Sequence, residues 1–325
     1  MKYRYIVVGY NYEYYKYVYR QLNDISETVY VNCWPKSQYL RFFYSYYIAH
    51  KFPFVKIWTL LFVCFLKKII KKNKWSSKDP TCFLLLAGGA NNDLLKYGVC
   101  EHIKKSFING KIVYFINDLI EKTHMPVELM KDHADLVYSF DPKECNRYGL
   151  LNHCIPYSDF HFPKNIKPIY DVAFVGAAKD RLKDILSIFF YLTERGVNCC
   201  FTIIGVPLEE QVQAECINYS GRISYEENLK ILQNSNCILD IIQGESSGNT
   251  IRVGEAIIME KRLLTNNVYT PQNGIFDENN MRIFRSLDDI DINFLKDRSP
   301  INYGIKEKMY PIDLLRCIDE KLSNK

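Results

Sequence analysis

The chain has 325 residues, of which 48% are hydrophobic and 24% charged, so it is too apolar for a disordered protein and long enough for two domains. Its net charge of +5 is too small to indicate nucleic-acid binding by itself. The 11 cysteines form no C-x-x-C pair, which argues against a disulfide framework and against a zinc site and favours a reducing cytoplasm.

Apolar strands alternate with helical patterns through the first half of the chain. The first apolar run is too short for a signal peptide and is expected to be a strand. Strands are expected at 3–9, 28–32, 82–89, 111–118 and 134–141. Helices are expected at 12–22, 91–107, 126–133 and 142–150. This alternation predicts a parallel sheet with helices on both faces.

Residues 39–75 interrupt the alternation with a segment that is aromatic, apolar and basic together. Its uninterrupted apolar core, 57–66, is ten residues long, whereas a membrane span needs about 20. One interpretation is a buried helix with a solvated polar end. The other is a helix at the membrane interface, whose aromatic residues enter the headgroup region while its lysines meet anionic lipids.

A second βα pattern follows a proline-rich linker at 156–168. Strands are expected at 170–176, 199–205, 236–243, 261–267 and 281–286, and helices at 179–196, 224–235, 249–260 and 311–325. We therefore expect an N-terminal domain at 1–160 and a second βα domain at 166–305. Residues 306–325 form a C-terminal helix that could pack back on the N-terminal domain.

Residues 174–184 place Gly176 at the end of a strand, with the cations Lys179 and Arg181 at the start of the next helix. Free N–H groups and the helix dipole favour an anion there, and the glycine allows close approach. The stretch matches neither G-x-G-x-x-G nor a Walker motif. It is either a phosphate-binding turn or an ordinary turn with surface cations.

Residues 246–257, SSGNTIRVGEAI, place a cation in the first turn of a predicted helix. Asn249 or Thr250 can cap this helix. Arg252 then opposes the helix dipole by ~0.3–1 kcal/mol, and Glu255 shares its face. A surface ion pair would explain the two charges. The apolar residues around them favour a ligand instead, with a diphosphate at Arg252 and a ribose diol at Glu255, because open α/β sheets bind ligands at strand carboxyl ends.

The patterns ISYEENLKILQNSNCILDI, SGNTIRVGEAI and KRLLTNN, within 223–267, resemble the donor-nucleotide half of GT-B glycosyltransferases. ADLVYSFDPKECNRYGL (134–150) is similar to bacterial capsule and lipopolysaccharide glycosyltransferases. The resemblance covers most of the chain. It implies an α/β protein with two Rossmann-like domains whose parallel sheets face a central cleft.

The resemblance also implies roles for individual residues. Donor-binding positions of the family match Gly176, Lys179, Arg181, Tyr225, Gly248, Asn249, Thr250, Arg252 and Glu255. Among these, Glu255 matches the glutamate that holds the donor ribose, and Tyr225 lies where the nucleobase packs. Many retaining members carry a second glutamate eight positions earlier, where this chain has Ser247.

Catalysis needs a base, or an electrostatic helper, from the first domain. Asp118 is our choice because it ends a strongly apolar strand, although it could instead cap the following turn. Asp93 is a second candidate, and Asp141, which precedes a proline, is expected to be a helix cap. The D-x-D sequence at 289–291 lies in an acidic run after the sheet and is not expected to hold a metal.

These observations predict an enzyme that moves a sugar from a nucleotide-diphosphate sugar to a growing glycan, which the resemblance implies is lipid-linked. No metal is expected, because helix N-termini and arginine can neutralise the leaving diphosphate. We expect a cytoplasmic protein held peripherally at the inner face of the cell membrane, with an anionic membrane surface as a partner and no nucleic acid. Alternatives are an epimerase-like enzyme of the same fold and a non-catalytic partner that binds glycolipid or nucleotide-sugar.

Overall fold

The structure is a computed structural model that describes residues 1–9, 12–31, 34–49, 57–123, 125–160, 166–242, 244 and 246–324. It divides into two compact units. The first unit comprises Met1–Ser158 and Tyr310–Lys325, and the second comprises Asp159–Met309. The C-terminal residues therefore belong to the same unit as the N-terminal ones.

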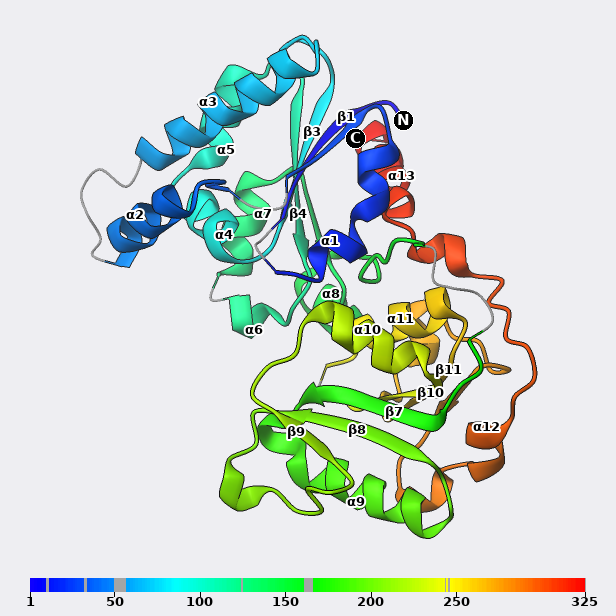
Figure 1. Ribbon diagram of the computed structural model, residues 1–325. Helices are drawn as coiled ribbons and strands as arrows, with labels where there is room; N and C mark the ends of the chain where they lie inside the picture. Colours follow the sequence, from blue (N-terminus) through cyan, green and yellow to red (C-terminus); the bar gives the residue numbers. More distant parts are fainter. Residues whose placement is uncertain are drawn as a thin grey trace. The chain divides into compact units, whose positions relative to one another are not determined.

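The first unit is built on a parallel six-stranded sheet in the order β2-β1-β3-β4-β5-β6. Its strands are β1 (Arg4–Val8), β2 (Thr28–Val31), β3 (Thr81–Leu86), β4 (Gly110–Ile116), β5 (Leu136–Ser139) and β6 (Leu151–Asn152). Its helices are α1 (Tyr15–Val18), α2 (Gln38–Ala49), α3 (Ile57–Lys72), α4 (Gly89–Lys96), α5 (Val99–Ser106), α6 (Ile120–Thr123), α7 (Val127–His133), α8 (Pro142–Tyr148) and α13 (Pro311–Ser323). Figure 1 shows α3, α5 and α7 on one side of the sheet, and α1 and α13 on the other.

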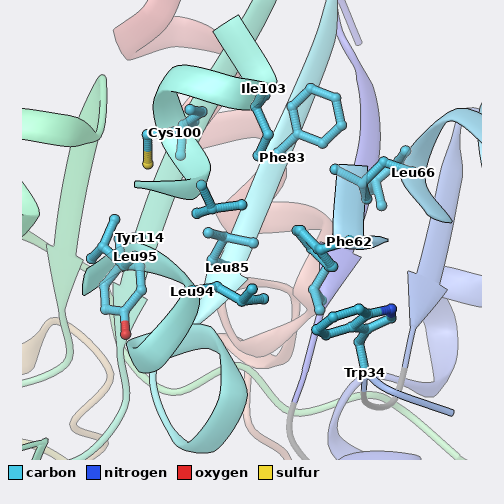
Figure 2. Close-up of a cluster of buried hydrophobic side chains, with 14 of the residues drawn as sticks. Trp34, Phe62, Leu66, Phe83, Leu85, Leu94, Leu95, Cys100, Ile103 and Tyr114 are labelled. Atoms are coloured by element: carbon cyan, nitrogen blue, oxygen red, sulfur yellow. The ribbon is translucent and has the colours of Figure 1, made fainter. Parts of the chain in front are cut away.

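Alternate residues of the central strands of the first unit face two different helical layers. Ile6, Phe83 and Ile112 are paired across β1, β3 and β4 and lie in one buried cluster with residues of α3, α4 and α5. Figure 2 shows Phe83 and Leu85 of β3 among side chains of these helices. Every residue of β3 is buried, as expected for a parallel strand covered on both faces.

Segment 39–75 contains two helices, and each has its own pattern of burial. α3 buries Trp58, Phe62 and Leu66 against the sheet, which agrees with the expectation of a buried helix. Tyr44 of α2 packs edge-on against Trp58, so the two helices touch, with ring centroids 5.2 Å apart. Other apolar residues on both helices are exposed, and none of the helices in the described parts of the chain reaches the length and apolarity needed to cross a membrane.

Two helices of the first unit differ from the prediction. The pattern at 91–107 predicts one helix, but the structure has α4 and α5, separated at Gly98. Gly98 adopts φ +80°, a left-handed conformation that an α-helix interior does not accommodate. The helix expected at 12–22 is reduced to the single turn of α1 and a 3₁₀ helix at Arg20–Asp24.

The second unit has its own parallel six-stranded sheet, in the order β12-β11-β10-β7-β8-β9. Its strands are β7 (Tyr170–Ala177), β8 (Cys199–Ile204), β9 (Asn218–Ser220), β10 (Ser235–Asp240), β11 (Arg262–Thr265) and β12 (Met281–Ile283). Its α-helices are α9 (Leu182–Glu194), α10 (Tyr225–Gln233), α11 (Ile251–Met259) and α12 (Ile292–Lys296). Figure 1 shows α10 and α11 on one side of this sheet and α9 on the other.

Helix α13 is fastened to the first unit by polar contacts with β1. The Tyr5 hydroxyl donates to the Asp319 carboxylate at 2.6 Å, and its oxygen also lies 2.9 Å from the Leu315 carbonyl, an alternative acceptor. The backbone N–H of Lys2 donates to the other oxygen of Asp319 at 2.6 Å. Leu314, Leu315 and other apolar residues of α13 are buried, so the helix is part of the hydrophobic core of this unit.

Candidate functional site

The chain order of the second sheet reverses between β7 and β10, because β8 and β9 follow β7 to one side whereas β11 and β12 follow β10 to the other. Open parallel sheets bind ligands in the crevice outside the carboxyl ends of the strands at such a reversal. β7 ends at Ala177 and β10 ends at Asp240. The residues after these two strands therefore form the candidate site.

Asp240 connects the end of β10 to the start of α11. Its carboxylate accepts hydrogen bonds from the Thr250 hydroxyl and the Thr265 hydroxyl, each at 2.9 Å. Thr250 is the N-cap of α11, and its hydroxyl oxygen accepts from the backbone N–H of Arg252. Burial raises the pKa of Asp240, and the two hydroxyls and two nearby arginines oppose that shift. A buried acid thus fixes where α11 begins.

Arg252 forms an ion pair with Glu255 inside the protein and not on its surface. Glu255 has no exposed surface, and the side chain of Arg252 is 17% exposed. The second terminal nitrogen of Arg252 donates to the Val175 carbonyl of β7 at 2.7 Å. Burial alone would lower the pKa of Arg252, but Glu255 and Tyr225 raise it. The cation in the first turn is therefore compensated by Glu255 itself and does not require a diphosphate.

The other oxygen of Glu255 is held from α10. The Tyr225 hydroxyl donates to Glu255 Oε1 at 2.7 Å, and Asn228 Nδ2 donates to the same oxygen at 3.1 Å. Tyr225 is placed by a capping box at the start of α10, in which Ser224 and Glu227 exchange hydrogen bonds. The structure thus brings together three predicted site residues, Tyr225, Arg252 and Glu255.

Residues 246–249, which lead into α11, are buried and hydrogen-bonded. Asn267 Nδ2 donates to the Gly248 carbonyl at 3.0 Å. Asn273 Nδ2 lies 3.1 Å from the Ser247 carbonyl and 3.3 Å from Asn249 Oδ1. These two amides hold the loop in one conformation, so the backbone that faces the start of α11 is preorganised.

The turn after β7 differs from the helix start predicted there. α9 begins at Leu182, and Lys179–Arg181 form a 3₁₀ turn in which Lys179 adopts φ +45°. Such strain in a residue other than glycine is concentrated at functional sites. The Arg181 guanidinium donates to the Ala177 carbonyl at 3.2 Å. A Cβ on Gly176 would lie 3.2 Å from this guanidinium, so the glycine leaves room for Arg181.

Charges of both signs meet where β7 and β10 end. Burial lowers the pKa of Arg181. The nearby Asp240 carboxylate opposes this lowering, whereas the nearby Arg252 guanidinium lowers the pKa further. Two arginines therefore lie within electrostatic reach of one buried carboxylate. An anion bound beside Arg181 would compensate the positive charge of this arginine, since the one carboxylate does not balance both cations.

Two buried polar atoms at this site have no hydrogen-bond partner among the described residues. One is the acceptor Asn228 Oδ1, on the residue that donates to Glu255, and the other is the donor Asn249 Nδ2, in the loop before α11. The two side chains are 3% and 2% exposed. A buried polar atom without a partner costs about 1–3 kcal/mol, so native structures keep few of them.

The carboxyl edge of the first sheet carries Asp118. This residue follows β4, and its side chain is 62% exposed. Its carboxylate accepts from the Leu119 N–H at 2.8 Å and lies 3.8 Å from Lys122 Nζ. Glu144 holds the same turn through the Ile120 N–H at 2.7 Å. Asp118 thus has a local backbone partner, as a cap would, and an open face towards solvent.

Asp93 lies on α4 near the reversal of the first sheet. The Tyr44 hydroxyl donates to it at 3.2 Å, and burial raises the pKa of its carboxyl group. Asn91, on the same helix, bridges the ends of β1 and β3 by donating to the Val8 and Leu86 carbonyls. The first unit therefore offers two different carboxylates, an exposed one at Asp118 and a partly buried one at Asp93.

The remaining acidic candidates have structural roles. Asp141 caps α8 by accepting from the Glu144 N–H at 3.1 Å, which confirms the prediction. Asp289 accepts from the N–H groups of Arg285 and Ser286, and Asp291 caps α12. Both acids of the D-x-D sequence therefore accept hydrogen bonds from backbone N–H groups.

Sequence reasoning missed several residues that shape the candidate site. They are Asp240, Asn228, Asn267, Asn273 and, in the first unit, Glu144. A polar residue such as Asp240 at the end of an apolar strand was a usable signal. The three asparagines lie in unremarkable polar stretches, and nothing in their sequence neighbourhoods predicts their contacts.

Solved structures of similar architecture are known. The lipopolysaccharide outer core galactosyltransferase WaaB, in its apo form, matches over 100% of this chain and 99% of its own, with a TM-score of 0.53 and 11% identity. An alpha-glucosyltransferase in complex with UDP-glucose and DNA containing an abasic site matches over 86% of this chain and 84% of its own, with a TM-score of 0.51 and 10% identity. The chain has the GT-B fold.

The likeness is one of fold, as the low identities show. The UDP-GlcNAc 2-epimerase from Methanocaldococcus jannaschii matches over 97% of this chain and 99% of its own, with a TM-score of 0.49 and 13% identity. No protein-family model matches the sequence, and no protein of curated function matches it. The GT-B fold, with two Rossmann-like sheets, confirms the predicted fold class.

Proposed function

We propose that the protein is a glycosyltransferase that binds a nucleotide-diphosphate sugar at the carboxyl edge of the second sheet. The ribose would lie at Glu255 and Asn228, with the nucleobase near Tyr225. The diphosphate would lie between the turn carrying Gly176, Lys179 and Arg181 and the start of α11, which carries Gly248, Asn249, Thr250 and Arg252.

The two unpartnered buried amide atoms carry this proposal. A ribose hydroxyl can donate to Asn228 Oδ1, next to Glu255, and a phosphate oxygen can accept from Asn249 Nδ2, next to the start of α11. Both atoms belong to residues at the sheet reversal, and one needs a donor whereas the other needs an acceptor. A nucleoside diphosphate supplies both groups in one molecule.

We propose that transfer needs no metal ion at this site. The leaving diphosphate would be stabilised by Arg181, Lys179 and the positive end of the α11 dipole. Arg252 contributes indirectly, because its pairing with Glu255 fixes the first turn of α11.

The first unit would supply the acceptor site and its base. Asp118 is the proposed base, because an exposed carboxylate at a strand end can reach an acceptor hydroxyl. Asp93 is the second candidate, since its raised pKa is suited to proton transfer. The acceptor would be a glycan, which we propose is lipid-linked and part of a bacterial surface polysaccharide.

Helices α2 and α3 favour such an acceptor, because together they expose apolar side chains and cations. The exposed apolar residues are Tyr39, Leu40, Phe42, Phe43, Tyr46, Ile57, Leu60 and Leu61. The exposed lysines are Lys67, Lys68, Lys71, Lys72 and Lys74. Each lysine near an anionic leaflet adds about 1 kcal/mol. We propose that this surface holds the protein peripherally at the cytoplasmic face of the cell membrane.

A thermal-shift screen with UDP, GDP, TDP and CMP, followed by a transfer assay, tests the donor proposal. A ligand at 100 times its dissociation constant adds about 2.7 kcal/mol of stability. We expect one nucleotide to raise the Tm and the matching nucleotide-sugar to lose its sugar to a glycan acceptor. Release of an epimerised sugar would favour an epimerase, binding without turnover would favour a non-catalytic partner, and no shift with any nucleotide would contradict the donor site.

Sedimentation with vesicles tests the membrane proposal separately. We expect vesicles containing phosphatidylserine to retain the protein at low salt, and the double variant Phe42→Ser/Phe43→Ser to bind several-fold less. Leu208→Ser is the control, because Leu208 is an apolar residue of the second unit that is even more exposed than Phe42 and Phe43. Equal retention of all three proteins would contradict the proposed surface.

A further inference from the structure

A histidine, an aspartate and a cysteine meet where α13 packs beside the end of β6 in the first unit. His153 follows β6 directly, and Asp313 and Cys317 lie four residues apart on α13, so they share a helix face. One ligand atom from each of the three lies within 4.8 Å of the others. His153 Nε2 and Asp313 Oδ2 are 3.4 Å apart.

The hydrogen bond on the other nitrogen of His153 limits what Nε2 can carry. Nδ1 lies 2.7 Å from the Cys154 carbonyl, which can only accept, so Nδ1 bears the hydrogen. Nε2 therefore faces the Asp313 carboxylate with its one remaining bonding position, where a proton or a metal ion can bridge the two atoms. The side chain of His153 is only 6% exposed, so this position is shielded from bulk water.

We propose that His153, Asp313 and Cys317 bind a Zn²⁺ ion. Imidazole nitrogen, carboxylate oxygen and thiolate sulfur are all ligands of this metal. Ligand atoms 2.0–2.3 Å from a tetrahedral Zn²⁺ lie roughly 3.3–3.8 Å apart, a range that includes the 3.4 Å between His153 and Asp313. All three ligand atoms lie within 4.8 Å of one another, so a small side-chain adjustment at Cys317 would complete the set. The Nδ1–H to carbonyl bond is the arrangement that usually orients a ligating histidine.

A water molecule would take the fourth position, and the 34% exposure of the Asp313 side chain provides access for it. The sequence conceals this site, since His153 and Cys317 are far apart in the chain and no C-x-x-C pair marks them. The ion would fasten α13 to the strand end of β6. This inference does not depend on the proposed donor site, whose residues belong to the second unit.

Cobalt substitution tests the site directly, because Co²⁺ occupies zinc sites and reports thiolate ligands by a charge-transfer band in the near ultraviolet. The full-length, reduced and chelator-treated protein would carry Cys64→Ser and Cys216→Ser, which remove two exposed thiols. We expect one equivalent of Co²⁺ to give the band, Zn²⁺ to abolish it, and Mg²⁺ to leave it unchanged. Zn²⁺ should also raise the Tm.

Three variants decide whether the band arises at these residues. Cys317→Ser and His153→Gln should each lose the band and the Tm increase, whereas Cys154→Ser, which alters the neighbouring thiol, should keep both. The variants should fold, because Tyr5 holds α13 independently through Leu315 and Asp319; far-ultraviolet circular dichroism checks this. Absence of the band, or its persistence in Cys317→Ser, would overturn the proposal, and a histidine–carboxylate pair holding only a proton would then account for the contact.

Discussion

The two sheets of this protein are built alike, but their carboxyl edges differ. In the second unit the edge holds two buried carboxylates with fixed partners: Asp240 accepts from the Thr250 and Thr265 hydroxyls, and Glu255 pairs with Arg252, which is 17% exposed. In the first unit, Asp118 is exposed and Asp93 is only partly buried. Buried charges demand specific partners, so the second edge is fixed in geometry before any ligand arrives.

This difference suggests a division of labour. A nucleotide presents the same ribose and diphosphate at every turnover, and a rigid, prepaired site suits it. On the proposed function, the acceptor is a glycan that varies in length, and its base must exchange protons with solvent, which an exposed carboxylate does. The variants below test whether the rigid edge and the open edge have these separate roles.

The largest effect is expected from breaking the Arg252–Glu255 pair. Arg252→Met or Glu255→Gln alone leaves one buried charge without its partner and should lower the free energy of unfolding by about 3–5 kcal/mol. The double variant should lose much less than the sum, because neither charge remains. Chemical denaturation of the wild type, the two single variants and the double variant measures the coupling energy of the pair. Glu226→Gln, at an exposed position, is the control. Additive losses would show that the pair is not coupled.

Asp118→Asn should reduce transfer activity by roughly 10²–10⁴-fold, the usual contribution of a general base, and leave nucleotide affinity unchanged. Glu121→Gln, an exposed acid three residues away, is the control and should keep full activity. If Asp118→Asn is active and Asp93→Asn is not, the base is Asp93 and the open edge is not where proton transfer occurs.

Asn249→Leu should weaken nucleotide binding by about 1–3 kcal/mol, or roughly 5- to 150-fold. The physical reason is that the variant removes a buried donor that only the ligand satisfies. The Tm of the free protein should change little, because the variant removes an unpartnered buried donor but also the oxygen that accepts from Asn273 at 3.3 Å. Asn293→Ser, at an exposed position, should affect neither quantity. A large drop in the Tm of free Asn249→Leu, with nucleotide affinity unchanged, would mean that the amide serves to accept from Asn273 and not to bind the ligand.

The smallest effect concerns pH. Burial raises the folded-state pKa of Asp93 above its ordinary value of 3.8, so the folded state holds this proton more tightly than the unfolded state. The contribution of Asp93 to stability is therefore fully present below pH 3.8 and is lost as the pH rises through the higher folded-state pKa. Tm values of wild type and Asp93→Asn should diverge across that window. A constant difference would exclude a raised pKa.

Much of the architecture could be predicted from the sequence, because apolar runs with turn residues between them specify parallel strands and helices. The same periodicity could not place helix breaks such as Gly98, where a single backbone conformation ends α4. The site was predictable at Arg252 and Glu255, whose charges are anomalous in an apolar helix. It was not predictable at Asn267 or Asn273, since a polar residue in a loop gives no sign of which carbonyl it will hold.

One sequence argument stays a prediction. The helix dipole and the apolar surroundings of Arg252 favour an anionic ligand beside it, whereas Glu255 and the Val175 carbonyl already compensate this charge within the protein. Spacing showed that Arg252 and Glu255 share a face. The spacing could not show that Arg252 contacts the Val175 carbonyl of β7, so that the Arg252–Glu255 ion pair lies inside the protein and not on its surface.

Calorimetric titration of the full-length protein with nucleoside diphosphates tests most directly whether a nucleotide occupies the carboxyl edge of the second sheet. We predict saturable binding of one of UDP, GDP or TDP to the wild type and to Asn293→Ser. Binding should be lost in the folded double variant Arg252→Met/Glu255→Gln. Equal affinity in the double variant, or no binding of any nucleotide to the wild type, would contradict the account.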